Sequence, residues 1–455
     1  MLQTALIVGV LGLPVVVAIW LALNESGPPD RVRWAISLTA DVTALCALGL
    51  LLFFAEQVPP FTFTWLPTAG PMRLSLATTS LYAVIATAMA VAIVYLIGSA
   101  ADMGPRPSYS GVLALTALAA GNLAFLSAHF LLRYVALEVV GLCIAAAPLL
   151  EEGGRERFVH AGWIYLLLRF GDAGLLTAIL LLGAKTGAFE ISAALEAVAT
   201  LPVYVQIWIN LGFFLAVAVK IGVWPFYAWI DSGRRLARNT SLWLYATLMP
   251  NLGLYLLYRV AALPTLLPET ALPLHTIFLI FGVGGGMLTL FALTQRPSAA
   301  RFPARSVALL TTLVWCAALL GGGKVAWWGL LALSLVRLPI YLAAPHKEEE
   351  DLEAPAPTWE RWDQQIERVA HRIRDDVEST LERGLDLMAG GISTAARYLY
   401  NVIEQQSLEG LLREVVRKTL QAGRQLQNWH TGRLRANLWW VILCLVLAVG
   451  FALGY

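Results

Sequence analysis

Long apolar runs separated by short polar loops fill the first 343 residues of the chain. A membrane-spanning helix needs about 20 apolar residues. Eleven runs meet this requirement, at residues 4–24, 34–55, 77–100, 110–128, 130–150, 161–184, 205–223, 241–262, 272–295, 305–322 and 325–343. A twelfth run, 436–455, ends the chain. The pattern predicts an all-α polytopic membrane protein with about 12 transmembrane helices.

Residues 344–435 interrupt this pattern with a long polar segment. An acidic, proline-containing linker at 344–356 precedes residues 357–435, in which apolar side chains recur every three or four positions. This spacing predicts an amphipathic helix that is too charged to cross a bilayer. Three interpretations remain open: a coiled coil, a helix lying on lipid, or a helix lying across neighbouring proteins. Because a membrane span lies at each end, we favour a lateral helix that braces neighbouring subunits.

The loops indicate which side of the membrane each end faces. Loops after odd-numbered runs contain eleven arginines, whereas loops after even-numbered runs contain four arginines or lysines. Positive residues are enriched in cytoplasmic loops. The bias therefore predicts that the odd-numbered loops and the lateral helix are cytoplasmic and that both termini are outside. The first run lacks a basic leading segment and a small-residue cleavage site, so we expect a retained helix rather than a signal peptide.

Composition agrees with a membrane protein and excludes several other classes. The chain is 58% hydrophobic and 14% charged, with a mean hydropathy of +0.68. Its net charge of +2 gives no indication of a nucleic-acid partner. The four cysteines lie far apart without a C-x-x-C pair, and no nucleotide, haem, flavin or metal motif is present. We therefore expect no cofactor and no redox or hydrolytic site in this chain.

Four ionisable residues lie deep within apolar runs: Glu138, Arg169, Asp172 and Lys220. A charge at mid-bilayer costs at least about 2.5 kcal/mol, so such residues indicate function. The chain has five lysines and 27 arginines, and a desolvated lysine exchanges its proton more readily than arginine does. Arg169 and Asp172 are three residues apart and are expected to pair. These residues form the candidate proton relay, with a static ion pair between Glu138 and Lys220 as the alternative.

Four further polar residues in or beside the apolar runs receive structural interpretations. Asp41 and Arg133 are expected to be boundary or packing residues. His129 is expected to be an interfacial histidine at a helix end. Arg337 is the lone charge of its run and is expected to snorkel to the interface.

The segment from Lys220 to Arg259, "KIGVWPFYAWIDSGRRLARNTSLWLYATLMPNLGLYLLYR", together with Glu138 and "RFGD", resembles a family. It is similar to the antiporter-like membrane subunits of respiratory complex I, membrane-bound hydrogenases and Mrp antiporters. The matching positions are Lys220, Pro225, Trp229, Ser241, Gly253, Tyr255 and Arg259. The C-terminal segment looks most like the lateral helix of the distal complex I subunit.

The resemblance implies a proton path through Glu138, Arg169, Asp172 and Lys220. It adds Tyr245, Asn251 and His129 as possible path members, and we expect Pro225 and Pro250 to break helices. Tyr245 and Asn251 stand where some members have histidine and lysine, and no acid or lysine lies deep in the last three runs before residue 343.

The predicted organisation follows from the runs and the resemblance together. It has N-terminal helices at 1–109, an antiporter-like repeat at 110–262 and an eroded second repeat at 263–343. The linker at 344–356, the lateral helix at 357–435 and a membrane anchor at 436–455 complete it.

The resemblance implies a proton-translocating subunit, with Na⁺ as an alternative ion, in an NADH:quinone oxidoreductase-like or hydrogenase-like complex. Its implied partners are other antiporter-like subunits and the lipid bilayer, in the inner (plasma) membrane of a bacterium. Two alternatives stay open: a non-pumping scaffold of such a complex, and the membrane proton channel of a bicarbonate-accumulating complex.

Overall fold

The computed structural model describes residues 1–343 apart from 25–26, 58–61, 64–69, 152–155, 225, 228, 231–232, 234–235, 261–273 and 295–301. Residues 344–455 lie outside the described part of the chain. The predicted linker, lateral helix and C-terminal membrane anchor all fall in that segment and stay predictions. Pro225 also lies outside the described residues.

A helix occupies each of the eleven apolar runs before residue 343. The helices are α1 (Leu2–Leu23), α2 (Pro29–Phe54), α3 (Thr78–Ile97), α4 (Pro107–Leu126), α5 (Phe130–Ala146), α6 (Glu156–Thr186), α8 (Val203–Ile221), α11 (Met249–Val260), α12 (Leu274–Thr294), α13 (Phe302–Gly321) and α14 (Gly323–Ala343). The eighth run begins as a π-helix, η6 (Ser241–Leu248), which continues directly into α11. Among the described residues, nine helices are long and apolar enough to cross a membrane. The predicted all-α polytopic membrane fold is confirmed.

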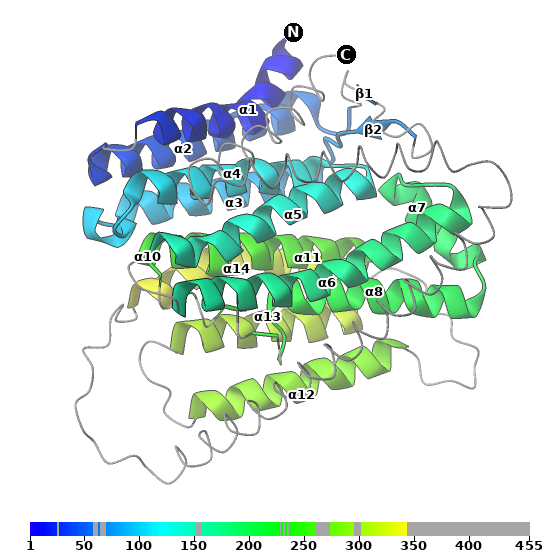
Figure 1. The fold of residues 1–455 in the computed structure, drawn as a ribbon. Coiled ribbons are helices and arrows are strands. Elements are labelled where there is room, and N and C mark those ends of the chain that lie inside the picture. Colours follow the sequence, from blue (N-terminus) through cyan, green and yellow to red (C-terminus); the bar gives the residue numbers. More distant parts are fainter. Residues whose placement is uncertain are drawn as a thin grey trace, which may run out of the picture. The chain divides into compact units, whose positions relative to one another are not determined.

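The helices pack side by side in an order that follows the chain only in part (Figure 1). Among the first five helices, α1 packs against both α2 and α4. Helix α2 also packs against α3, and α4 also packs against α5. Helix α6 lies between α5 and α8, and α11 lies between α8 and α14. Helices α13 and α12 follow, with α12 at one edge of the row. The mid-chain helices α5, α6, α8 and α11 therefore lie in the middle of this packing order.

The loops after the second, fourth and sixth spans meet at one end of the bundle. Strand β1 (Thr62–Phe63) pairs with β2 (Met72–Arg73), and the short helices α7 (Ile191–Ala197) and η4 (Val198–Thr200) lie at the same end. The amide of Ala128 donates to the carbonyl of Arg73 at 3.0 Å. The amide of Ile191 donates to the carbonyl of Ala128 at 2.8 Å. Three loops are therefore tied together by backbone hydrogen bonds.

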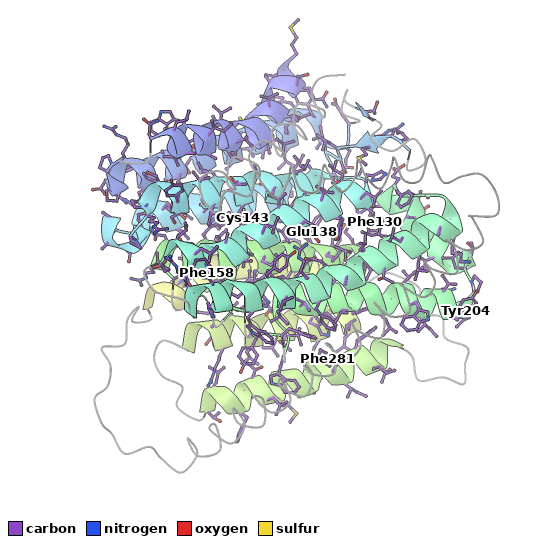
Figure 2. The ribbon with its side chains drawn as sticks, viewed as in Figure 1. Phe130, Glu138, Cys143, Phe158, Tyr204 and Phe281 are labelled. Carbon is purple, nitrogen blue, oxygen red and sulfur yellow. The ribbon has the colours of Figure 1, made fainter. Side chains whose placement is uncertain are left out.

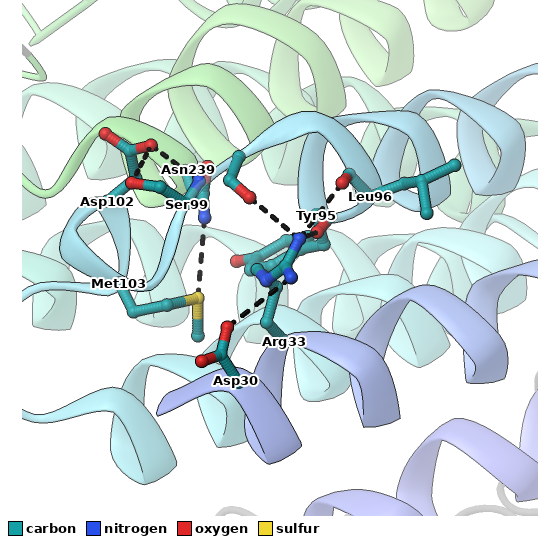
Figure 3. Close-up of polar contacts among 9 residues, drawn as sticks. Asp30, Arg33, Tyr95, Leu96, Ser99, Asp102, Met103 and Asn239 are labelled. Atoms are coloured by element: carbon teal, nitrogen blue, oxygen red, sulfur yellow. Dashed lines mark hydrogen bonds and ion pairs between the residues drawn. The ribbon is translucent and has the colours of Figure 1, made fainter. Parts of the chain in front are cut away.

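Loops after odd-numbered spans meet at the opposite end, which also holds η2 (Ala100–Met103), η3 (Ala147–Leu150) and α10 (Arg238–Thr240). Arg33 on α2 donates to three carbonyls at the end of α3, those of Tyr95, Leu96 and Gly98 (Figure 3). Its guanidinium thus caps orphan carbonyls at the negative end of that helix dipole. The amide of Ala237 donates to the Glu151 carboxylate at 2.7 Å. The described chain therefore passes back and forth between the two ends of the bundle, as the sidedness prediction requires. Which of the two ends is cytoplasmic stays a prediction.

A π-helix stands where a proline break is expected. Pro250 is the second residue of α11, and the helix continues through it to Val260. Proline clashes with the carbonyl four residues earlier, here that of Ala246, which lies inside the π segment. The amide of Met249 reaches back five residues to the carbonyl of Leu244. Pro250 therefore does not break the helix, and the chain accommodates it by widening the preceding turns.

Helices α6 and α8 approach each other closely through two facing glycines, Gly174 and Gly212. A Cβ atom on Gly212 would lie 2.5 Å from the Gly174 carbonyl oxygen, and one on Gly174 would lie 2.9 Å from the Gly212 carbonyl oxygen. Both distances are too short for a real side chain, because the atoms met are backbone. Small residues allow such approaches between membrane helices. This contact sets how closely α8 can lie against α6.

We expect Gly212→Ala to lower the stability of the protein by about 1–3 kcal/mol, because the new methyl group must push α8 away from α6. The measurement is the midpoint of thermal unfolding in detergent. Gly162→Ala is the matched control, since Gly162 also lies in a helix but has nothing within 4 Å of its Cβ position. Equal midpoints for the two variants would contradict the close approach.

Candidate functional site

Four ionisable side chains from α5, α6 and α8 form a continuous row in the middle of the bundle. Glu138 on α5 pairs with Arg169 on α6, and Lys220 on α8 pairs with Asp172 on α6. The two pairs are joined because Arg169 Nη2 lies 3.2 Å from Asp172 Oδ2. The signs therefore alternate along the row. We call these four residues the ion-pair row; Figure 2 labels its first member, Glu138.

The position of Lys220 depends on an early end to its helix. Helix α8 ends at Ile221, and Gly222 adopts the left-handed conformation with φ of 70°. The indole of Trp229 donates to the freed carbonyl of Val219 at 2.7 Å. Because Asp172 lies in the middle of the 31-residue α6, α8 must end about halfway along its neighbour. The negative end of the α8 dipole therefore lies beside the Lys220 ammonium, which it stabilises.

The pairing within the row differs from a simple Glu138–Lys220 pair. Each of these two residues has its partner on α6 instead, and the Arg169–Asp172 contact predicted from their spacing is confirmed. Sequence spacing shows that Arg169 and Asp172 share a helix face, but only tertiary packing decides which side chains face them. The alternative interpretation, a direct ion pair between Glu138 on α5 and Lys220 on α8, is therefore wrong.

Burial increases along the row from α5 toward α8. The side chains of Arg169 and Glu138 are 24% and 16% exposed, whereas those of Asp172 and Lys220 are 2% and 1% exposed. Gly141, three residues after Glu138, gives the guanidinium room, since a Cβ there would lie 3.0 Å from Arg169 Nη2. The row thus has a partly accessible end and a fully buried end. The Glu138–Arg169 end therefore lies nearer the outer surface of the bundle than the Asp172–Lys220 end does.

The additional path members predicted from the sequence do not join the row. The buried Tyr245 donates from its hydroxyl to the carbonyl of Ile144 at 2.6 Å. His129 accepts a hydrogen bond from the amide of Leu131 at 3.2 Å and stacks on Phe189. It precedes Glu138 by nine residues, which is about 13 Å along a helix axis. His129 is therefore at a helix end, as expected for an interfacial residue, and its role in a path stays a prediction.

A second buried cation lies beyond the row. Arg337 on α14 is fully buried and donates to Asn251 Oδ1 at 2.6 Å. Asn251 in turn donates to Ser334 at 2.9 Å and to Thr87 at 3.4 Å. Arg337 therefore does not snorkel. The expectation was wrong because Asn251 Oδ1 on the neighbouring helix α11 accepts a hydrogen bond from the guanidinium within the bundle.

Helix α11 separates Lys220 from Arg337 at nearly the same depth. Gly253 faces Lys220, since a Cβ there would lie 3.0 Å from Lys220 Cβ. Asn251, two residues earlier, contacts Arg337. Positions two apart lie on opposite sides of a helix and differ by about 3 Å in height. The two cations therefore flank α11 on opposite sides, a relation that sequence reasoning missed because it treated Arg337 as a lone surface charge.

Arg133 is a packing residue, as predicted. It is buried and donates to the carbonyls of Ala124 and Ser127, at 2.9 Å and 2.6 Å, at the end of α4. Its guanidinium also lies 5.1 Å from the ring centre of Tyr255, whose hydroxyl contacts Ser80 at 2.7 Å. Arg133 thus fastens α4, α5 and α11 together. No cluster of three or more metal-ligating side chains occurs among the described residues.

Comparison with known proteins agrees with this geometry. Residues 127–299 match the family model described as NADH:quinone oxidoreductase/Mrp antiporter, transmembrane. The predicted family resemblance is confirmed. The matched segment contains the whole ion-pair row, whereas Arg337 lies beyond it.

Two curated relatives show how far the resemblance extends. NADH-ubiquinone oxidoreductase chain 4 of Metridium senile is 31% identical over 202 residues, 44% of this chain and 39% of that protein. NADH-quinone oxidoreductase subunit M of Rickettsia prowazekii is 23% identical over 270 residues, 57% of this chain and 54% of that protein. The chain therefore spans about half the length, or less, of the curated relatives that it matches. A particular likeness to the distal complex I subunit rests on "RFGD" at 169–172 and on the C-terminal segment outside the described residues, and it stays a prediction.

A solved structure shares the fold. A chain of the Mrp complex from Dietzia sp. superposes with a TM-score of 0.63 at 21% identity, covering 73% of this chain and 37% of that chain. Three positions carried over from the resemblance have clear structural roles here. Trp229 caps the helix end beside Lys220, Gly253 lets α11 approach Lys220, and Tyr255 packs under Arg133. Two of these three positions, Trp229 and Gly253, therefore lie where they help to hold Lys220 in place.

We expect Asn251→Leu to destabilise the protein by about 2–3 kcal/mol, because leucine cannot accept the hydrogen bond of the buried Arg337 guanidinium. The double variant Asn251→Leu/Arg337→Leu should recover much of this loss, since it removes the buried charge as well. Thermal unfolding in detergent measures both. Asn24→Leu, at an exposed site, is the control and should change stability by less than about 0.5 kcal/mol. Additive losses in the double variant would contradict the coupling.

Proposed function

We propose that this chain is an antiporter-like membrane subunit of a complex I-like or Mrp-type assembly and that its ion-pair row transfers protons. The observation that carries the proposal is the row itself. Four ionisable residues of alternating sign lie in contact inside an apolar bundle, at a cost that proteins rarely accept without function. The match of residues 127–299 to the transmembrane family supports the assignment.

Because the charges of the row alternate in sign, a change of charge at one end alters the ion pair at the other end. Protonation of Glu138 removes the negative charge that holds Arg169. Arg169 then interacts more strongly with Asp172, to which it already lies 3.2 Å away. Asp172 in turn holds the Lys220 ammonium less strongly, and this weaker ion pair is the step that passes the change on to α8. Coulomb interactions at these distances are strong because the surroundings exclude water.

Glu138 has the features of the residue that receives the proton. Its side chain is at the partly accessible end of the row. Its Oε2 atom pairs with Arg169, while Oε1 is buried and accepts no hydrogen bond from the described residues. Buried polar atoms normally have partners, so Oε1 is the natural position for an added proton.

Arg337 gives the row a fixed positive charge on the far side of α11. Arginine keeps its proton in proteins, so Arg337 acts as a barrier and not as a carrier. Its positive charge on the far side of α11 repels a proton and so opposes proton passage into the α12–α14 half. We therefore propose that the proton leaves Lys220 along the region after α8 and not through the last three described helices.

The experiments described below also distinguish two other functions from proton transfer. A scaffold would use the same charges only to hold α5, α6 and α8 together. The membrane channel of a bicarbonate-accumulating complex would use the relay but assemble with different partners. The proposed orientation, with both termini outside and residues 344–435 on the cytoplasmic side, rests on the arginine bias of the odd-numbered loops.

We expect Lys220→Arg to reduce proton transfer to background while the complex still assembles. Arginine keeps the positive charge that Asp172 needs but does not release its proton. Proton transfer is followed with a pH-sensitive dye in inverted membrane vesicles, and assembly is followed by native gel electrophoresis of the same membranes. Lys185→Arg, at an exposed site in the last turn of α6, is the matched control.

We also expect Glu138→Gln to abolish proton transfer without preventing assembly, because glutamine still contacts Arg169 but takes up no proton. Normal proton transfer in both Lys220→Arg and Glu138→Gln would overturn the relay. Loss of the assembled complex in both would indicate a scaffold. A soluble zinc enzyme co-purifying in place of membrane subunits would indicate the bicarbonate-accumulating alternative.

A further inference from the structure

The outer face of α2 carries a regular stripe of exposed side chains. Its members are spaced alternately four and three residues apart: Trp34, Leu38, Asp41, Leu45, Leu48 and Leu52. The opposite face of α2 is buried against α1 and α3. A 4-3 spacing is the pattern of a helix that packs along a second helix. Helices α1 and α2 form one edge of the row of helices, so this stripe faces outward (Figure 1).

Asp41 is a carboxylate at the middle of this outward stripe. It lies 12 residues from the start of α2 and 13 from its end, which places it about 18 Å from either end. No other ionisable residue in the middle of a described span has an exposed side chain. No hydrogen bond or ion pair among the described residues involves its carboxylate. The expectation that Asp41 is a packing or boundary residue of this chain is therefore wrong, because the side chain points away from the bundle.

Lipid is an unfavourable neighbour for this side chain. A charged residue at mid-bilayer costs at least about 2.5 kcal/mol, and such residues almost always face protein or a water-filled cavity. An aspartate is too short to reach headgroups about 15 Å away, unlike the long side chains that snorkel. A protein partner with a positive group at the depth of Asp41 would remove this cost.

The charge of Asp41 distinguishes three candidate partners: the C-terminal run of this chain, a second copy of the chain and a different subunit. The C-terminal apolar run of this chain, 436–455, contains no ionisable side chain that could neutralise Asp41. A second copy packed on the same face about a two-fold axis would bring Asp41 close to its own counterpart, and like charges repel. We propose that the outer face of α2 binds a transmembrane helix of a different subunit, which presents a lysine or arginine opposite Asp41.

This inference concerns assembly and does not depend on proton transfer by the ion-pair row. The partner helix would pack its small or apolar side chains between the leucines of the stripe, and its cation would pair with Asp41. The pair fixes both the depth and the identity of the partner, because a helix without the cation would leave a carboxylate unpaired in an apolar interface.

The test places a photo-activated cross-linking amino acid at Leu45, one turn from Asp41, in the full chain in its native membranes. We expect a covalent product with a different membrane protein, joined at a helix that carries a lysine or arginine at matching depth. The same amino acid at Leu313, which is exposed in the middle of α13, is the control for random contacts. Mass spectrometry of the product identifies the joined segment.

Charge variants of Asp41 then test the pairing. Asp41→Lys should lower the yield of the product at least about tenfold, because it places like charges together. Exchanging the partner's cation for glutamate should restore that yield. Asp41→Leu should lower the yield without lowering the thermal stability of the isolated protein, since the side chain is exposed and has no hydrogen bond or ion pair among the described residues. This second variant separates loss of docking from loss of folding.

Several outcomes overturn the inference. These are a product with a second copy of the chain, a product with residues 436–455 of the same chain, labelling of lipid alone, or a partner helix without a cation. An undiminished yield in Asp41→Leu also overturns it. Lys220→Arg should stop proton transfer and leave the yield unchanged, so failure of this inference and failure of the proposed function give different results.

Discussion

Ion pairs that cannot be hydrated determine how the middle of this protein is built. Within an apolar bundle each charge must find an opposite charge or a set of hydrogen-bonding partners. Helix α6 meets this requirement for two neighbours at once, since Arg169 pairs with Glu138 on α5 and Asp172 pairs with Lys220 on α8. The facing glycines Gly174 and Gly212 bring α8 close enough for the second pair to form. Packing and electrostatics therefore depend on each other here.

Irregular helix geometry occurs around the same row. Helix α8 ends at Ile221, half-way along α6, and its freed carbonyls are satisfied by Trp229 and by Thr311. Helix α11 begins after a π-helix whose wider turns accommodate Pro250. Non-helical backbone at membrane depth is tolerated only inside protein or beside water. The irregular segments thus place helix ends beside Lys220 in the interior, where the proton leaves the side chain in the proposed relay.

The charges at the two edges of the bundle have different consequences. Arg337 is enclosed on α14 and held by Asn251, so its charge acts on the interior. Asp41 points outward from α2, so its charge acts on whatever protein lies against that edge. The proposed docking at α2 agrees with the names of its relatives, which include a subunit of an oxidoreductase and a chain of an Mrp complex.

The sequence by itself determined the positions of the spans and the members of the ion-pair row. Apolar runs of about 20 residues have few alternatives to a membrane helix, and ionisable residues inside them are few enough to be identified directly. The spacing of Arg169 and Asp172 also predicted their contact, because residues three apart share a helix face. These properties depend on local composition and periodicity alone.

Only the tertiary structure decided which charges meet and which face outward. The partners of Glu138 and Lys220, the enclosure of Arg337 and the exposure of Asp41 all depend on the rotation and neighbours of whole helices. Apolar residues surround most of these helices, so the sequence pattern gives no strong signal for one rotation over another. Close contacts at glycines and pairing of opposite charges select the rotation, and both involve residues far apart in the chain.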